Sequence, residues 1–242
     1  MAFLSVIVIV SGYFLGSIPV GLLLVRAIAG KDVRQVGSGR TGGTNVLRAA
    51  GLWAALLTAL GDGTKGLLAV WLARALGSAP VIEALAGLSA VAGHNYSIFL
   101  GFKGGAGTAT TVGGAIGLWP WNGAVLVGVG ATVIAGTRYA SLGSITVALL
   151  LPLIFALRAW LAGAPWAYLV HGLGSSLLTL WALRPNIRRL FEGRERRVTL
   201  SRARASLPPT QASLPPARAG LPTVPAARSG RRPPDGSVRD RP

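Results

Sequence analysis

The chain of 242 residues is 51% hydrophobic and only 13% charged, with a mean hydropathy of +0.55, whereas about a quarter of the residues of an ordinary soluble domain are charged. It contains no cysteine and two histidines, which excludes a disulfide framework, a thiolate nucleophile and a cysteine-based metal site and argues against a histidine-rich one. The composition indicates a membrane protein, and the 34 glycines are typical of helices that pack closely in lipid.

Seven apolar segments follow along the chain, at 3–25, 52–76, 81–100, 106–118, 123–137, 142–157 and 166–183. A membrane-spanning helix needs about 20 apolar residues. The pattern therefore predicts an all-α, polytopic integral membrane helix bundle of about seven transmembrane helices, and five or six remain possible because the fourth and fifth segments are short. The first segment has no basic residue before it, so we expect a retained helix, kinked near Pro19, and not a signal peptide.

The net charge is +17, and the distribution of the basic residues among the loops predicts the orientation of this bundle. With the N-terminus outside, the outer loops hold only Arg158, with Arg74 near the end of the second segment, and the other basic loops are cytoplasmic. The positive-inside bias favours this N-out, C-in arrangement. We expect residues 1–195 to form the membrane domain and the Pro- and Arg-rich residues 196–242 to form a disordered cytoplasmic tail. Nucleic acid is not an expected partner, because no basic domain interleaved with aromatic residues is present.

The polar stretch at 93–110 reads GHNYSIFLGFKGGAGTAT. Backbone N–H groups of the glycines beside Lys103, together with the N-terminus of a helix starting near Thr108, would make an anion cradle. A plain hinge between two membrane helices is the alternative interpretation. The candidate anion-binding residues are Lys103, Gly104, Gly105, Gly107 and Thr108.

A second polar loop, at 38–45, reads SGRTGGTN and is rich in hydrogen-bond donors. Arg48 follows one helical turn later and would bind a phosphate bidentately. We therefore favour a phosphate-binding site over a flexible loop whose arginines serve only topology. Ser38, Asn45 and Arg48 are its candidate residues.

Three ionisable residues lie within or beside apolar segments. Asp62 and Lys65 are three residues apart, on one helix face, and we expect a structural ion pair more than a substrate site. His94 is a candidate general base or a partner of a helix end. His171 has no polar neighbours in the sequence, and no role is assigned to it.

The remaining polar candidates, Ser141 and Asn186, fall on the cytoplasmic side in this topology, as do both loops. Arg188 and Arg189 are interpreted as a juxtamembrane basic cluster. The sequence contains no Ser-His-Asp set, no pair of loop carboxylates and no cluster of metal ligands. The reaction of such a site would need little acid–base help, and two phosphate-binding loops in a membrane indicate a phosphorylated polar substrate that meets a lipid.

Five stretches in this order carry a family resemblance: VGSGRTGGTNVLR, DGTKG, GHNYSIFLGFKGGAGTAT, RYASLGSI and RPNIRRLFEGRE. Over about residues 12–195 the chain resembles the bacterial acyl-phosphate-dependent glycerol-3-phosphate acyltransferases (PlsY-type). The resemblance implies a multi-pass protein of the bacterial cytoplasmic (inner) membrane with seven helices and a site that faces the cytoplasm. It also implies acyl transfer from acyl phosphate to the sn-1 hydroxyl of glycerol 3-phosphate, which gives lysophosphatidic acid and phosphate, without a metal or another cofactor.

By the same resemblance, Ser38, Lys103 and Asn186 take catalytic roles. Substrate or phosphate binding is implied for the matching positions Asn45, Arg48, Gly104, Gly105, Gly107, Thr108 and Ser141, and supporting roles for Asp62, Lys65 and His94. The chain departs from the family pattern at three positions, where Arg40 replaces Asn, Ala106 replaces Lys and Leu183 replaces His. An inactive or altered-specificity paralogue and a transporter of a phosphorylated metabolite are therefore the alternative functions.

Overall fold

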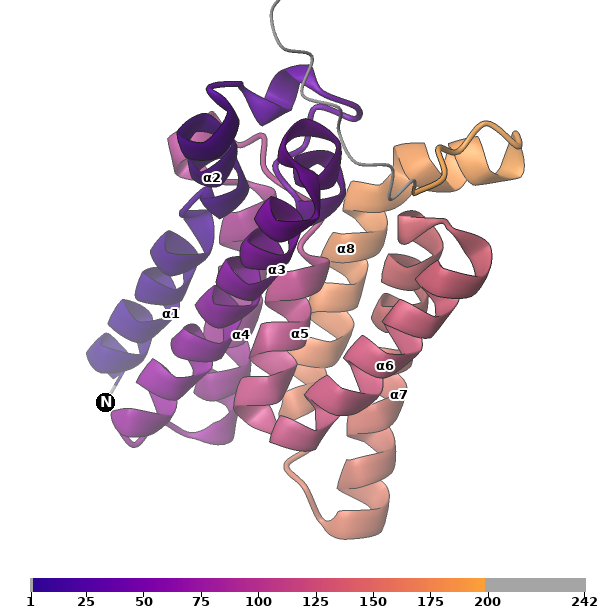
Figure 1. The fold of residues 1–242 in the computed structure, drawn as a ribbon. Coiled ribbons are helices and arrows are strands. Elements are labelled where there is room, and N and C mark those ends of the chain that lie inside the picture. Colours follow the sequence, from indigo (N-terminus) through magenta and orange to yellow (C-terminus); the bar gives the residue numbers. More distant parts are fainter. Residues whose placement is uncertain (1, 199–242) are drawn as a thin grey trace, which may run out of the picture. The chain divides into compact units, whose positions relative to one another are not determined.

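The structure, a computed structural model, describes residues 2–198, and all regular elements in that range are helical (Figure 1). They are α1 (Ala2–Ser17), α2 (Val20–Ala29), α3 (Gly43–Ala75), α4 (Pro80–Asn95), α5 (Thr108–Leu118), α6 (Pro120–Thr137), α7 (Ala140–Ala162) and α8 (Tyr168–Phe191), with short 3-10 turns at Val33–Gln35 and Ile98–Leu100. The all-α prediction is confirmed for this range. The predicted tail at 196–242 lies, apart from its first three residues, outside the described residues.

Each apolar segment corresponds to one helix, except that the first is divided between α1 and α2 at Pro19. The helices extend beyond the apolar segments at several places. Within the polar stretch at 26–50, α2 continues to Ala29 and α3 begins at Gly43. The polar residues at 61–65 lie inside α3, whose one non-helical residue is Gly51, with φ +86°. The last helix continues beyond the apolar run, through Pro185 to Phe191.

The joint between α1 and α2 is held by side chains from two other segments. The helix is interrupted between Ser17 and Val20, so the carbonyl groups at the end of α1 lack their usual helical donors. The hydroxyl of Ser97 donates to the carbonyl of Ser17 at 2.6 Å, and Lys65 Nζ donates to the carbonyl of Ile18 at 2.8 Å. The kink predicted at Pro19 is therefore a fixed part of the bundle.

A second proline, Pro152, lies inside α7. Its missing N–H frees the carbonyl of Ala148, four residues earlier. Ser176 Oγ, from the neighbouring α8, donates to this carbonyl. The proline is thus tolerated because the adjacent helix replaces the lost hydrogen bond.

Glycines bring α3 and α5 into backbone contact. A Cβ added at Gly66 would lie 2.1 Å from the carbonyl oxygen of Thr110, and one added at Gly113 would lie 1.8 Å from that of Gly63. No larger residue fits at either position. This close approach places the N-terminus of α5 beside the polar residues of α3.

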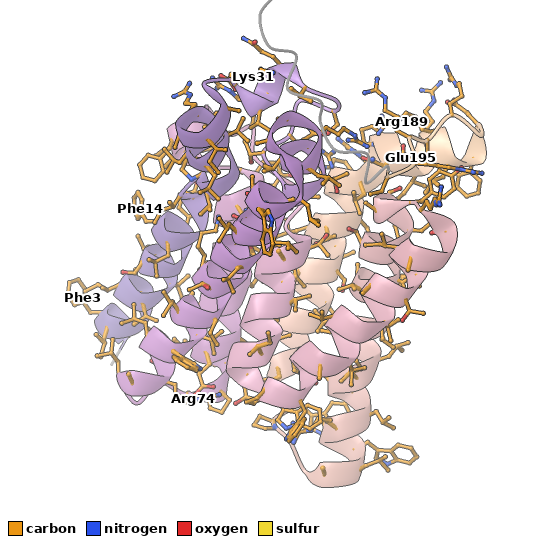
Figure 2. The ribbon with its side chains drawn as sticks, in the orientation of Figure 1. Phe3, Phe14, Lys31, Arg74, Arg189 and Glu195 are labelled. Atoms are coloured by element: carbon orange, nitrogen blue, oxygen red, sulfur yellow. The ribbon has the colours of Figure 1, made fainter. Side chains whose placement is uncertain are left out.

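The outer surface of the bundle is apolar. Phe3 and Phe14 point away from it in Figure 2, and large side chains such as Trp53 (79% exposed) and Leu60 (68% exposed) do the same. Within the described residues, the stretches Ala2–Ala29 and Ala140–Ala162 are long and apolar enough to cross a membrane. Lys31, Arg189 and Glu195 lie at one end of the bundle and Arg74 at the other (Figure 2).

At the Arg74 end, a network of side chains ties four helices together. Arg74 donates to the Glu83 carboxylate at 2.7 and 3.2 Å and to the carbonyl of Gly117 at 2.9 Å. The hydroxyl of Tyr168 donates to the same carboxylate at 3.0 Å. Every charge of this cluster is paired, so it serves as a structural clamp.

Candidate active site

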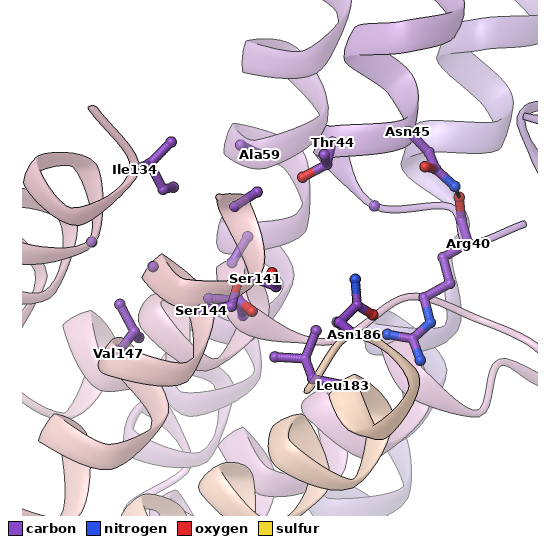
Figure 3. A pocket seen from close by; sticks show the side chains of 18 of the residues that line it. Arg40, Thr44, Asn45, Ala59, Ile134, Ser141, Ser144, Val147, Leu183 and Asn186 are labelled. Carbon is purple, nitrogen blue, oxygen red and sulfur yellow. Dashed lines mark hydrogen bonds between the residues drawn. The ribbon is translucent and has the colours of Figure 1, made fainter. Parts of the chain in front are cut away.

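The opposite end of the bundle contains a cavity of about 570 Å³. Its wall is formed by the loop before α3, the starts of α3 and α5, one face each of α6 and α7, and the end of α8 (Figure 3). A second cavity, of about 430 Å³, lies beside it, and Ser38 and Arg40 line both.

Asn45 organises the loop that forms one wall of the larger cavity. Its side-chain nitrogen faces three acceptors, the carbonyls of Val36 and Arg40 and the hydroxyl of Ser38, at 2.9 to 3.0 Å. Its side-chain oxygen accepts a hydrogen bond from Arg48 at 2.9 Å. Asn45 is only 3% exposed. Its amide is therefore engaged within the protein, and its role is to place Ser38 and Arg48.

Arg48 lines the larger cavity, and within residues 2–198 its guanidinium pairs with no carboxylate. Arg189 also lines the cavity, but it donates to Glu195 at 2.8 Å. An arginine that is partly buried without a counter-ion favours an anion in the adjacent space.

The predicted ion pair of Asp62 and Lys65 is present, buried and joined by His94. Lys65 Nζ lies 2.7 Å from Asp62 Oδ1 and 3.2 Å from Nδ1 of His94. The same ring nitrogen of His94 lies 3.5 Å from Asp62 Oδ1, so His94 contacts both members of the pair. Asp62 and His94 reach the cavity wall, whereas Lys65 lies behind it. The arrangement supports the structural interpretation of the pair.

The glycine-rich loop departs from its predicted role. The N–H of Gly104 donates to the carbonyl of Asn95 and that of Gly105 to the carbonyl of His94, both at 3.0 Å. These two amides are therefore not free to hold an anion. Both glycines are instead required by crowding, because an added Cβ would lie 1.9 Å from the carbonyl oxygen of His94 at position 104 and 2.0 Å from its Nε2 at position 105.

The anion-binding part of this loop begins after Gly105. As predicted, a helix, α5, starts at Thr108, and it does so directly on the cavity wall. The first N–H groups of a helix have no intrahelical acceptor and point toward its N-terminal end. Thr108 Oγ1 is buried without a hydrogen-bond partner in the described range. The start of α5 is thus equipped to receive a phosphate, whereas Lys103 lies in the wall of the second cavity.

On the far side of the larger cavity, Ser141 and Asn186 meet through Glu195. They donate to one oxygen of its carboxylate at 3.0 and 2.7 Å, and Arg189 donates to the other. Burial disfavours the charged form of Glu195, but the hydrogen bonds from Asn186, Arg189 and Ser141 outweigh it, so its pKa lies below the ordinary value. Glu195 therefore holds Ser141 and Asn186 in fixed positions.

The structure brings most of the predicted residues to one place. Those that line the larger cavity are Ser38, Asn45, Arg48, Asp62, His94, Gly107, Thr108, Ser141 and Asn186. Lys103, Gly104 and Gly105 line the second cavity. Sequence reasoning missed Glu195. It assigned Arg188 and Arg189 to a juxtamembrane basic cluster, but Arg189 lines the larger cavity, whereas the side chain of Arg188 is 81% exposed.

The other part of the larger cavity is apolar. It is lined by Leu56, Ala59, Val112, Leu126, Val127, Gly130, Ala131, Ile134 and Val147. Leu56 on α3 and Val127 on α6, in this part of the wall, are about half exposed, at 50% and 57%. The cavity therefore offers an anion site at one end and space for a hydrocarbon chain at the other.

Comparison with known proteins identifies a family that the chain matches. Residues 6–193 match the family model described as glycerol-3-phosphate acyltransferase. The chain is 43% identical over 194 residues to a glycerol-3-phosphate acyltransferase of Rubrobacter xylanophilus, and the match covers 80% of this chain and 95% of the relative. It is 46% identical over 190 residues to a glycerol-3-phosphate acyltransferase of Geobacter sulfurreducens, and that match covers 76% of this chain and 93% of the relative.

Two solved structures resemble the fold described above. Both are crystal structures of PlsY (YgiH), described as an integral membrane glycerol 3-phosphate acyltransferase. The glycerol 3-phosphate form superposes with a TM-score of 0.73 at 34% identity, and the lysophosphatidic acid form with 0.70 at 32%. Each comparison covers 81% of this chain and 96% of the other.

Proposed function

The chain belongs to the glycerol-3-phosphate acyltransferase family and is an enzyme of phospholipid biosynthesis, and we propose that it takes its acyl group from an acyl phosphate and transfers it to the sn-1 hydroxyl. The products are then lysophosphatidic acid and inorganic phosphate. The observation that carries the proposal is the larger cavity, which has Arg48, without a carboxylate partner among residues 2–198, and the start of α5 at one end and an apolar wall at the other. Both substrates have a phosphate, and the donor has a long hydrocarbon chain.

In the proposed reaction, the glycerol hydroxyl attacks the acyl carbonyl carbon. The new ester C–O bond forms, the bond between that carbon and the phosphate oxygen breaks, and phosphate leaves with the electron pair. Phosphate is a good leaving group, so no enzyme nucleophile is needed, and the hydroxyl proton passes to a phosphate oxygen. His94 is not required as the base, since its Nδ1 faces Lys65.

The start of α5 holds the departing phosphate in this proposal, through Gly107 and Thr108 and the positive end of the helix dipole. Ser38, Arg48 and Asn186 position the acceptor. Lys103 acts from the second cavity by its charge, and Asn45, Ser141, Gly104 and Gly105 fix the geometry. Asp62, Lys65 and His94 support the bundle beneath.

We further propose that the protein crosses the bacterial cytoplasmic (inner) membrane seven times, α1 and α2 together forming the first span, with the N-terminus outside and the site facing the cytoplasm. The end of the bundle that holds the site carries Lys31 and Arg189 (Figure 2), together with Arg40 and Arg48 in the cavity wall. The positive-inside bias therefore favours this end as the cytoplasmic one.

The direct test uses the purified full chain in detergent with acyl phosphate and glycerol 3-phosphate. Phosphate release and lysophosphatidic acid are expected together in equal amounts. Arg48→Ala is expected to lower kcat/KM by one to two decades, because a charged hydrogen bond contributes about 1.5–3 kcal/mol. Arg188→Ala, which removes the same charge from an exposed position, should leave activity unchanged. No phosphate release, with a known family member active alongside, would refute the proposal.

The apolar part of the cavity allows a separate prediction about which acyl-chain lengths the enzyme prefers. Ala131→Phe fills space in the cavity wall, so we expect a shift of preference toward shorter acyl phosphates, with the KM for glycerol 3-phosphate unchanged. Val125→Phe, on the exposed side of the same helix, is the matched control. Rates measured across a series of chain lengths would decide, and equal profiles for both variants would contradict this placement of the acyl chain.

A further inference from the structure

Arg40 occupies the wall shared by the two cavities. In Figure 3 its guanidinium points toward Leu183 and Asn186, two of the residues of α8 that line the larger cavity. The side chain reaches α8 because the loop before α3 is folded around Asn45, whose side-chain nitrogen donates to the backbone carbonyl of Arg40 at 2.9 Å. The position of Arg40 is therefore fixed at both ends.

The guanidinium is only partly satisfied. One nitrogen donates to the carbonyl of Ala182, and no other acceptor contacts the side chain among residues 2–198. A guanidinium carries five N–H donors, so most of them are left for a ligand. Its fork geometry matches two oxygens of one phosphate.

The charges around Arg40 also call for an anion. Burial lowers the pKa of the Arg40 guanidinium, and the neighbouring Arg189 and Arg184 lower it further, against the opposing effect of Glu195. Glu195 itself is already bound by Ser141, Asn186 and Arg189. Arg40, Arg184 and Arg189 thus lie near a single carboxylate, that of Glu195, which is already hydrogen-bonded. A dianionic phosphate between the cavities would reduce the repulsion among the three arginines.

Of the other cations near Arg40, Arg189 lines the larger cavity but is already bound to Glu195. Position 106 is alanine and position 183 is leucine, and both line that cavity. Lys103 and Arg184 line the second cavity instead. Arg40 reaches both spaces from one place.

We propose that Arg40 is a substrate-binding residue of this chain, whose guanidinium holds a phosphate group at the wall shared by the two cavities. The inference rests on the proposed function for the identity of the ligand. The phosphate belongs either to glycerol 3-phosphate or to the acyl phosphate, and the experiment distinguishes these sources. The hydrogen bond to Ala182 aligns the side chain for this task.

The test compares Arg40→Gln and Arg40→Lys with Arg188→Gln, which removes an equal charge outside both cavities. In Arg40→Gln we expect the KM for one of the two substrates to rise about tenfold or more, which identifies the bound phosphate, while the KM for the other changes less than threefold. Arg40→Lys should recover part of this loss, because it restores the charge without the fork. The unfolding temperature in detergent should stay close to that of the unmodified chain in all three.

A second readout does not depend on turnover. Binding of inorganic phosphate to the full chain, measured by calorimetry in detergent, should weaken about tenfold in Arg40→Gln and stay unchanged in Arg188→Gln. If the chain releases no phosphate from acyl phosphate, the proposed function fails, but this binding difference still tests Arg40. The proposal would be overturned if Arg40→Gln and the unmodified chain had the same affinity for phosphate, or if both substrates had the same KM in Arg40→Gln as in the unmodified chain. Arg40 would then serve only as a structural contact with α8.

Discussion

Replacing Asp62 by leucine is expected to destabilise the bundle by about 3–5 kcal/mol, since it leaves the ammonium group of Lys65 buried without its carboxylate. Both side chains are almost fully enclosed, at 3% and 7% exposed. Lys65 would keep its contacts with His94 and the carbonyl of Ile18, but neither carries a compensating charge. The measurement is the unfolding free energy in mixed detergent, or the thermal midpoint.

Two companion variants make this prediction specific. Glu192→Ala breaks ion pairs with Arg188 and Arg194 on the exposed end of α8 and should change stability little, because exposed pairs contribute little. The double variant Asp62→Leu with Lys65→Met removes both charges and should be more stable than Asp62→Leu alone. If the double variant were the less stable one, the destabilisation would come from packing and not from an uncompensated charge.

Gly104→Ala is expected to abolish most of the activity, because the added methyl group would overlap the backbone carbonyl of His94 at 1.9 Å. A backbone atom cannot rotate away, so the loop itself has to move, and overpacking of this kind costs about 1–3 kcal/mol. The displacement would carry the start of α5 out of position at the cavity wall. We therefore expect the specific activity of the folded fraction to fall at least tenfold.

Gly136→Ala provides the control for this substitution. Gly136 lies in α6 with nothing within 4 Å of an added Cβ, and alanine is the better helix former by about 1 kcal/mol. Its stability should rise slightly and its activity should persist. Full activity of Gly104→Ala would show that the loop can relax without moving α5, contrary to the packing described here.

The helices could be predicted from the sequence because a long apolar run leaves the backbone no other way to satisfy its hydrogen bonds in lipid. The bounds of the helices are harder to read from the sequence where charged residues or a proline lie inside a helix. Lys65 and Asp62 look like an interruption in the sequence, yet pairing lets α3 continue through them. Pro185 looks like a helix end, but α8 continues to Phe191.

The residues of the site could be predicted better than their roles. Gly104 and Gly105 were identified from their spacing, but where their N–H groups point depends on the fold of α4, whose last carbonyls accept them. Glu195 was missed because its partner Ser141 lies 54 residues earlier, beyond any local pattern. Roles that depend on contacts between distant segments need the tertiary structure.

The half-exposed apolar wall at Leu56 and Val127 has a kinetic consequence under the proposed function. If the tail of the proposed acyl phosphate enters past these side chains from lipid, the donor reaches the enzyme by diffusion in two dimensions, and a lysolipid product leaves by the same route without passing its tail through water. The rate should then follow the mole fraction of donor in the bilayer and not its bulk concentration. Added inert lipid, at constant total donor, would slow the reaction by surface dilution.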